Sequence, residues 1–191
     1  MPPTKRFQRD EIIDTAYKIV EKEGFTSVNA RRIAKELGGS VQPIYHNFAT
    51  MEELNKEVFD KIYKKYQDTM KNAIDEEHPY LAKGIAYVKF AKEFPEFYKI
   101  IFMQESKMNI DEFIQADIEV TENVMESIIK KFDISKEDLK KFHIQVWIYS
   151  HGLACLVATK TVDFSDDEIR EQLLNTVQQL FIGYKIVLSN L

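Results

Sequence analysis

Apolar residues recur at helical spacing through the first fifty residues. A first helix is predicted from the apolar positions between Ile12 and Val20, and Gly24 ends it as a C-terminal glycine does. Two short helices are expected next, at residues 29–37 and 40–48, and the Gly38-Gly39 pair separates them. The pattern therefore predicts three helices close to the N-terminus.

The remaining sequence continues in the same period. Thr50 and Glu53 have the spacing of a capping box, which opens a long fourth helix. Five further helices are expected, at residues 81–91, from residue 95, and at 110–129, 135–159 and 165–184. No segment alternates with period two over the length of a strand. The sequence thus predicts an all-α protein of about nine helices, with a three-helix head at residues 1–49 and a larger helical body at residues 50–191.

Composition and charge add to this picture. The 191 residues include 6 Gly and 5 Pro, too few for the many turns of an all-β protein. The formal net charge is -5, but residues 1–50 carry +2 and the rest -7, so phosphate would attract one end of the protein and repel the other. Cys155 is the single cysteine, which excludes an intrachain disulfide and suits a reducing compartment. With no apolar segment of membrane-spanning length and no signal-peptide core, the expected location is the cytoplasm.

A short helix, a glycine-containing turn and a second short helix are typical of a helix-turn-helix, although an ordinary corner of a helical bundle has the same spacing. In the first interpretation, the third helix and its turn would face the major groove. Gln and Asn can bond base edges, Tyr and Ser reach phosphate, and an apolar side chain can meet the thymine methyl group. The candidate groove-facing residues are Ser40, Val41, Gln42, Pro43, Tyr45, His46 and Asn47. Lys5, Arg6 and Arg9 form either a basic arm for the minor groove or a solvated terminus.

Residues 24–28, 32–38, 42–48 and 52–54 closely resemble the N-terminal signature of the TetR family, over roughly residues 8–58. The resemblance implies a three-helix DNA-binding head and a helical body that dimerises and holds a small-molecule inducer. It also places Asn29, Ala30 and Arg31 near the DNA. Two positions depart from the signature: Met51 stands where the family often has a phosphate-binding Lys, and Gly39 where Val is more common.

The body is rich in aromatic and Met residues, which pack a core and can also enclose an apolar pocket. Polar groups on the predicted eighth helix could orient an apolar or aromatic inducer there. The candidate pocket residues are Phe90, Phe94, Phe102, Met125, His143, Trp147 and His151. No cofactor is expected. His143 and His151 would lie about 12 Å apart along a helix, too far to share a metal ion, and no enzyme motif is present.

The last two predicted helices carry more apolar residues than one buried stripe needs, so a partner subunit is expected to cover the surplus. The candidate interface residues are Leu153, Val157, Leu173, Val177, Leu180, Phe181 and Tyr184. The alternative is that both helices lie inside the core of one subunit. The sequence thus predicts a homodimeric repressor that is released from a palindromic DNA operator by a ligand. An activator, a ligand-independent DNA binder, and a helical adaptor whose head no longer binds DNA remain alternatives.

Overall fold

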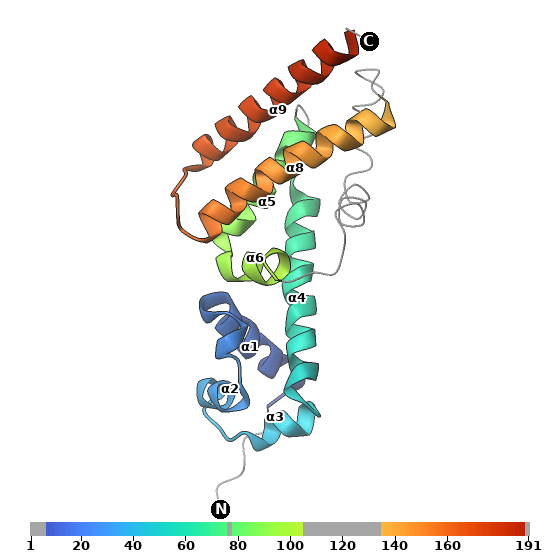
Figure 1. Ribbon diagram of the computed structural model, residues 1–191. Helices are drawn as coiled ribbons and strands as arrows, with labels where there is room; N and C mark the ends of the chain where they lie inside the picture. The colour runs from blue at the N-terminus through green and yellow to red at the C-terminus, as the bar shows by residue number, and fades with distance from the viewer. Residues whose placement is uncertain (1–6, 76–77, 105–134, 190–191) are drawn as a thin grey trace, which may run out of the picture. The chain divides into compact units, whose positions relative to one another are not determined.

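The computed structural model describes residues 7–75, 78–104 and 135–189, and this part of the chain contains helices and no strand (Figure 1). The all-α prediction is therefore confirmed. The helices are α1 (Arg9–Glu23), the single turn η1 (Phe25–Ser27), α2 (Ala30–Leu37), α3 (Gln42–Asn47), α4 (Met51–Asn72), α5 (Pro79–Glu93), α6 (Pro95–Phe102), α8 (Lys136–Ala158) and α9 (Asp166–Ser189). The helix predicted at residues 110–129 lies outside the described residues.

The chain divides into two compact units. The N-terminal unit comprises Met1–Asp68 and Phe94–Gln104, and the C-terminal unit comprises Thr69–Glu93 and Glu105–Leu191. Helix α4 therefore has residues in both units. Helix α6 belongs to the N-terminal unit, although it follows α5 in sequence. These units differ from the functional division predicted between residues 49 and 50, which stays a prediction.

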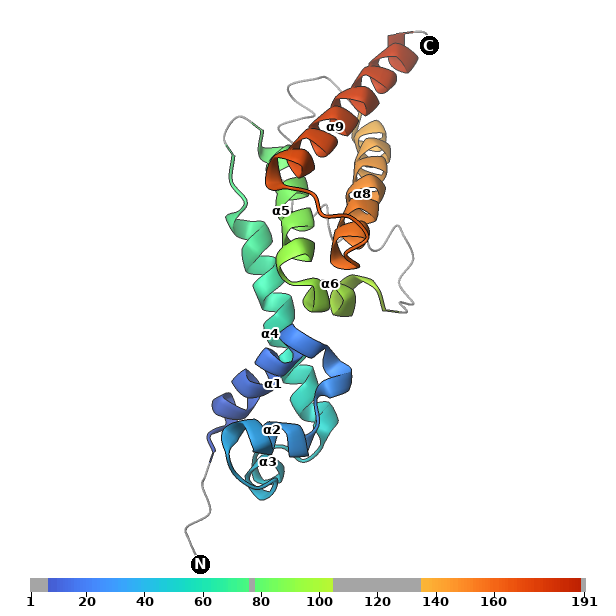
Figure 2. The same ribbon diagram turned by 90° about the vertical axis from the view of Figure 1, so that its left-hand side faces the viewer.

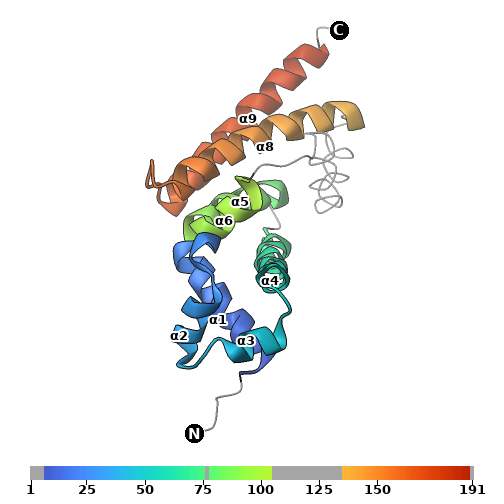
Figure 3. The same ribbon diagram turned by 60° about the horizontal axis from the view of Figure 1, so that its bottom comes forward.

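In the N-terminal unit, α1 packs against η1, α2, α3 and α6 (Figure 3). Its start is capped where the Gln8 backbone N–H donates to the Glu11 carboxylate at 2.8 Å, and it ends at Gly24, as predicted. Helix α6 packs against α1, with the rings of Tyr17 and Phe97 4.8 Å apart and Phe97 fully buried. At the start of α4 the Thr50 hydroxyl accepts from the Glu53 N–H at 3.2 Å, as half of the predicted capping box. The Glu53 carboxylate accepts from the Ala49 N–H at 2.8 Å.

In the C-terminal unit, α5 packs against both α8 and α9, and these two helices also pack against each other (Figure 2). Gly84 of α5 faces both neighbouring helices, since a Cβ there would make ordinary van der Waals contact with Leu173 of α9 at 3.7 Å and with Ser150 of α8 at 3.8 Å. The predicted caps Ser135 and Ser165 open α8 and α9 by accepting from backbone N–H groups three residues on. Among the described residues, no helix is long and apolar enough to cross a membrane.

Candidate DNA-binding surface and C-terminal cavity

Helix α2 and the turn after it are fixed by local chemistry. The Asn29 side chain caps α2 by accepting from the Arg32 N–H at 2.9 Å. Gly38 ends the helix in the left-handed region at φ 67°, which glycine adopts without steric cost. The N–H groups of Gly38 and Gly39 close the helix end on the carbonyls of Lys35 and Ala34. These bonds fix the path of the chain into the next helix.

Helix α3 divides its side chains cleanly between core and solvent. Pro43 and Ile44 are buried and anchor the helix to the unit. Gln42, Tyr45 and His46 are exposed, and Tyr45 has 54% of its surface accessible. Ser40 and Val41, in the turn before the helix, are also exposed. One end of the N-terminal unit thus presents hydroxyl, amide, imidazole and apolar groups on a short, firmly seated helix.

Asn47, the last residue of α3, braces this helix. Its side-chain amide donates to the Pro43 carbonyl at 2.8 Å and to the Phe7 carbonyl at 3.2 Å. The Phe7 ring in turn lies over Gly39, where a Cβ would come within 2.5 Å of it. A side chain at position 39 would therefore displace the end of the Phe7 ring.

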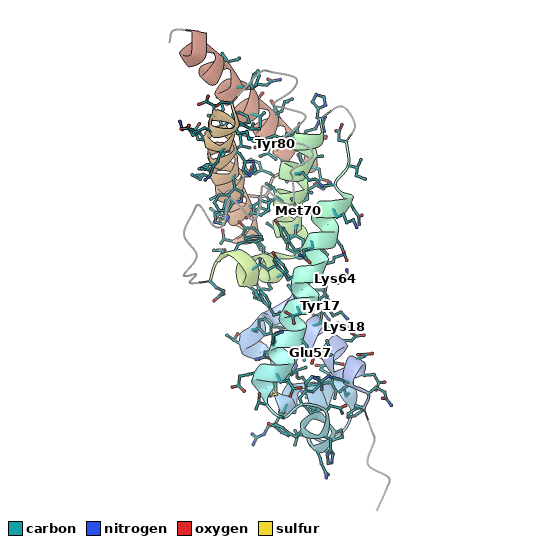
Figure 4. The ribbon with its side chains drawn as sticks, turned by 90° about the vertical axis from the view of Figure 1, so that its right-hand side faces the viewer. Tyr17, Lys18, Glu57, Lys64, Met70 and Tyr80 are labelled. Carbon is teal, nitrogen blue, oxygen red and sulfur yellow. The ribbon has the colours of Figure 1, made fainter. Side chains whose placement is uncertain are left out.

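Arg9 ties α1 to α3 and α4. Its guanidinium donates to the Asn47 backbone carbonyl, to the Glu53 carboxylate at 2.7 Å and to Glu57, which is labelled on α4 in Figure 4. The same group lies 4.0 Å from the centre of the Phe48 ring. Hydrogen bonds to Glu57 and Glu53 raise the pKa of Arg9, and the bond from Arg9 lowers the pKa of Glu53.

Two adjacent arginines of α2 differ in their surroundings. Arg32 lies 2.8 Å from Glu23 and 3.2 Å from Glu36, although its Nε lacks hydrogen-bond geometry to the second carboxylate. Arg31 is exposed and forms no ion pair within the part of the chain that the structure describes. The Arg31 guanidinium is therefore available to an external anion, whereas that of Arg32 is neutralised inside the unit.

The C-terminal unit contains a small cavity of about 50 Å³. Helix α5 contributes Tyr80, Lys83, Gly84 and Tyr87 to its lining, and α8 contributes His143, Val146, Trp147 and Ser150. Met70, from the last turns of α4, completes the wall; Figure 4 labels it together with Tyr80.

Two tyrosine–histidine hydrogen bonds join α5 to α8 at this cavity. The Tyr80 hydroxyl lies 2.9 Å from Nδ1 of His143, and the Tyr87 hydroxyl lies 2.9 Å from Nδ1 of His151. The His151 ring stacks on Trp147 with 4.9 Å between centroids, and burial lowers the pKa of His151. The polar atoms of the wall are thus held in place by the packing of two helices.

Residues 12–58 match the model of the family described as bacterial regulatory proteins, tetR family. This segment, which runs from α1 into α4, has the sequence pattern of a tetR-family regulatory protein. The match supports a role as a DNA-binding transcriptional regulator.

Solved structures share the fold of this chain over nearly its whole length. A protein of unknown function from Rhodococcus sp. RHA1 has a TM-score of 0.71 at 19% identity, over 96% of this chain and 98% of its own. A TetR-like transcriptional regulator from the same strain has a TM-score of 0.63 at 14% identity, over 95% and 100%. The fatty acid degradation regulator FadR from Bacillus halodurans has a TM-score of 0.52 at 18% identity, over 93% and 96%. At these identities the likeness shows the fold alone. No curated protein sequence matches the chain.

Three of the residues predicted to face DNA do not lie free on the surface. Ala30 and Pro43 are buried, because they anchor α2 and α3 to the unit. Asn47 is half-buried and its amide is engaged by backbone carbonyls. The remaining seven are exposed: Asn29, Arg31, Ser40, Val41, Gln42, Tyr45 and His46. Arg9 holds α1 to α3 and α4, whereas Lys5 and Arg6 lie outside the described residues.

The predicted pocket is only partly the observed cavity. His143 and Trp147 line it, and His151 stands behind Trp147. Phe90 belongs to the C-terminal unit but is a core residue with 1% of its surface exposed. Phe94 and Phe102 belong to the N-terminal unit, where they pack on Phe97 and on Tyr66 and Tyr98, and Met125 lies outside the described residues. Sequence reasoning missed the α5 wall, whose signal was a tyrosine at positions 80 and 87 with Lys83 between them on one helical face.

Six of the seven residues predicted to form the dimer interface have described side chains, and these are buried or partly buried within their own unit. Leu153, Val157 and Leu173 are core residues, with Leu173 only 1% exposed. Val177, Leu180 and Phe181 are partly buried against a cluster of Leu139, Phe142 and Val146, and the side chain of Tyr184 lies outside the described part. The described residues among them thus pack on the core of their own unit, and the position of the dimer interface stays a prediction. Among the described side chains of α8 and α9, the large apolar residues that are exposed are Ile148, Leu156 and Ile182, at 55%, 42% and 57%.

Proposed function

We propose that this regulator is a repressor that binds a palindromic operator as a homodimer and is released by a small molecule in its C-terminal unit. The exposed face of α3 carries the proposal: Gln42, Tyr45 and His46 project from a helix whose other side is anchored and braced. A reading helix needs this combination, because base contacts discriminate only when the backbone behind them is held still.

The side chains on this face divide into two roles. Gln42 is suited to a bidentate contact with adenine, and Val41 to the methyl group of thymine. Tyr45, Ser40 and Arg31 are suited to phosphate, and Arg31 brings a charge that no acidic neighbour in the described chain neutralises. Base contacts would set the operator sequence, and phosphate contacts would set affinity and its dependence on salt.

Two copies are needed to read a palindrome symmetrically. We place the dimer surface on the exposed side of α8 and α9. Ile148 and Leu156 are exposed about two turns apart along α8, and Ile182 is exposed on α9. Gly152 lies between the two α8 residues, and a Cβ there would meet nothing within 4 Å, so a partner helix can approach closely. Pairing of these faces would cover apolar side chains that water otherwise contacts.

Operator binding is tested first, by sequencing genomic fragments retained by the purified protein and titrating the recovered site over a range of salt. Arg31→Ala should weaken binding to every sequence and reduce the slope of log affinity against log salt by about 0.9, because one phosphate contact is lost. Arg32→Ala is the matched control, and its salt slope should stay unchanged since its charge is already paired within the head. Salt-independent retention of DNA, or no retention, would contradict the proposal.

The dimer surface is tested by sedimentation at micromolar concentration, with circular dichroism as a check of folding. Ile148→Asp should yield helical monomers that bind the operator much more weakly. Ile74→Asp is the control, because Ile74 is also a large exposed apolar residue, at 80%, but lies outside α8 and α9. If Ile148→Asp stays dimeric, this surface is not the interface.

A further inference from the structure

The cavity of the C-terminal unit contains one cationic group with an incomplete set of partners. The ammonium of Lys83 donates to the backbone carbonyl of Met70, and it forms no ion pair among the residues that the structure describes. Lys89 and Lys92 of the same helix lie 2.5 Å and 3.9 Å from the Asp166 carboxylate. Lys83 is thus set apart from the other lysines of α5 by its position in the cavity wall.

The surroundings of Lys83 favour a negative charge. An ammonium has three donors, of which the Met70 carbonyl accepts one. No Asp or Glu is among the described residues that line the cavity. Burial lowers the pKa of Lys83, because the charged form loses water without gaining a counter-ion. An anion bound here would stabilise the charged form of the Lys83 ammonium, which burial destabilises.

The rest of the wall specifies the other half of a ligand. Val146, Trp147 and Met70 offer apolar surface beside the ammonium, and the hydroxyl of Tyr80 lies at the wall where it bonds His143. The cavity volume of about 50 Å³ corresponds to a few water-sized groups, since one water needs about 10–15 Å³. A small charged head group and the first carbons of an apolar chain match this volume.

The single positive charge of Lys83 limits the class of ligand that the cavity can bind. One ammonium balances one negative charge, whereas a phosphate monoester carries about -1.5 to -2 near neutral pH and would bury charge without a partner. We propose that the inducer is an amphipathic monocarboxylate whose head group pairs with Lys83 and whose apolar chain packs on Trp147. This inference deepens the proposed function by naming the class of ligand that the C-terminal unit recognises.

Trp147 makes the proposal directly measurable. It is the single tryptophan of the chain and it lines the cavity, so intrinsic fluorescence reports occupancy of this site. The probes are octanoate, octanamide and octylamine, which share chain length and differ in the charge of the head group. We expect octanoate to bind at least tenfold more tightly than octanamide and octylamine to bind most weakly, because only the carboxylate pairs with an ammonium.

Variants then assign the preference to Lys83. Lys83→Met should weaken octanoate binding by about tenfold to a hundredfold and leave octanamide binding unchanged, since the methionine keeps the length of the side chain but not its charge. Lys89→Met is the matched control on the same helix and should bind all probes as the unaltered protein does. Lys83→Gln serves as a second variant where Lys83→Met does not fold by circular dichroism.

Several results would overturn the inference: no fluorescence response to octanoate, equal affinity for octanoate and octanamide, or an octanoate affinity that survives the loss of Lys83. Operator binding is measured on the same samples without ligand. If the unaltered protein does not bind the operator, the proposed function is contradicted. If it binds the operator but has equal affinity for octanoate and octanamide, only the ligand class is contradicted.

Discussion

Asn47→Ala should weaken the N-terminal unit without changing which bases the protein prefers. The Asn47 amide donates two hydrogen bonds, to the carbonyls of Pro43 and Phe7, and both are lost in the variant. A net hydrogen bond contributes about 0.5–1.5 kcal/mol, so two would contribute about 1–3 kcal/mol. Because Asn47 is half-buried, water replaces part of the loss, and we expect a decrease of about 1–2 kcal/mol in the free energy of unfolding.

The assay combines urea unfolding, followed by circular dichroism, with titration of the recovered operator and of versions carrying single base-pair changes. Asn47→Ala should lower the urea midpoint and weaken binding to all versions by a similar factor, because α3 is held less firmly. Gln42→Ala is the contrasting variant. Its side chain is exposed, so stability should change by less than about 0.5 kcal/mol, while discrimination at one or two base pairs should fall by about 1–3 kcal/mol.

The reasoning would be refuted by the reverse pattern. An Asn47→Ala protein of unchanged stability that has lost its preference at one base pair would mean that Asn47 leaves its intramolecular partners and reads DNA. Unchanged binding by Gln42→Ala would mean that α3 presents another face to the groove.

Three further changes have expected outcomes. Gly38→Ala should destabilise the head by about 1–2 kcal/mol in urea, since residue 38 is left-handed at φ 67°, and an unchanged midpoint would contradict this. Met51→Lys should raise operator affinity and steepen the log–log salt slope by about 0.9 if α4 begins beside a phosphate; an unaltered slope places residue 51 away from the backbone of the DNA. Burial lowers the pKa of His151 from its ordinary 6.5, so the unfolded chain takes up this proton first. The stability that neutral His151 contributes is therefore present above pH 6.5 and lost as pH falls below it, and His151→Gln should flatten the urea midpoints measured between about pH 7.5 and 5.5.

The helix starts and ends could be predicted because their chemistry is local. Asn29, Ser135 and Ser165 each accept from a backbone N–H three residues on, and this contact depends only on the residues between them. Gly38 is similar, since the left-handed turn it forms is completed by carbonyls of its own helix. The third helix begins at Gln42 rather than at Ser40, and no side chain caps its start.

The roles of single side chains in the head required tertiary structure. Asn47 and Pro43 have residue types and spacing suited to a groove, but partners distant in sequence decide which way a six-residue helix turns. The bond from Asn47 reaches Phe7, forty positions earlier, and Arg9 reaches Glu53 and Glu57. No periodicity within residues 40–48 contains that information.

The apolar residues of α8 show the same limit of sequence-based prediction. The sequence predicts that a partner subunit covers the surplus apolar residues of this helix. Most of that surplus, including Leu153 and Val157, is buried within the subunit, and α5 and α9 are the helices that pack against α8. A helix in contact with two neighbours has a wide apolar surface even in a monomer, so the count of apolar residues cannot distinguish a partner from a core. What distinguishes them is exposure after folding. By that criterion only Ile148 and Leu156 on α8 are candidates for the interface, and the mutations that test dimerisation belong there rather than at Val177 or Phe181, where they would disrupt the core.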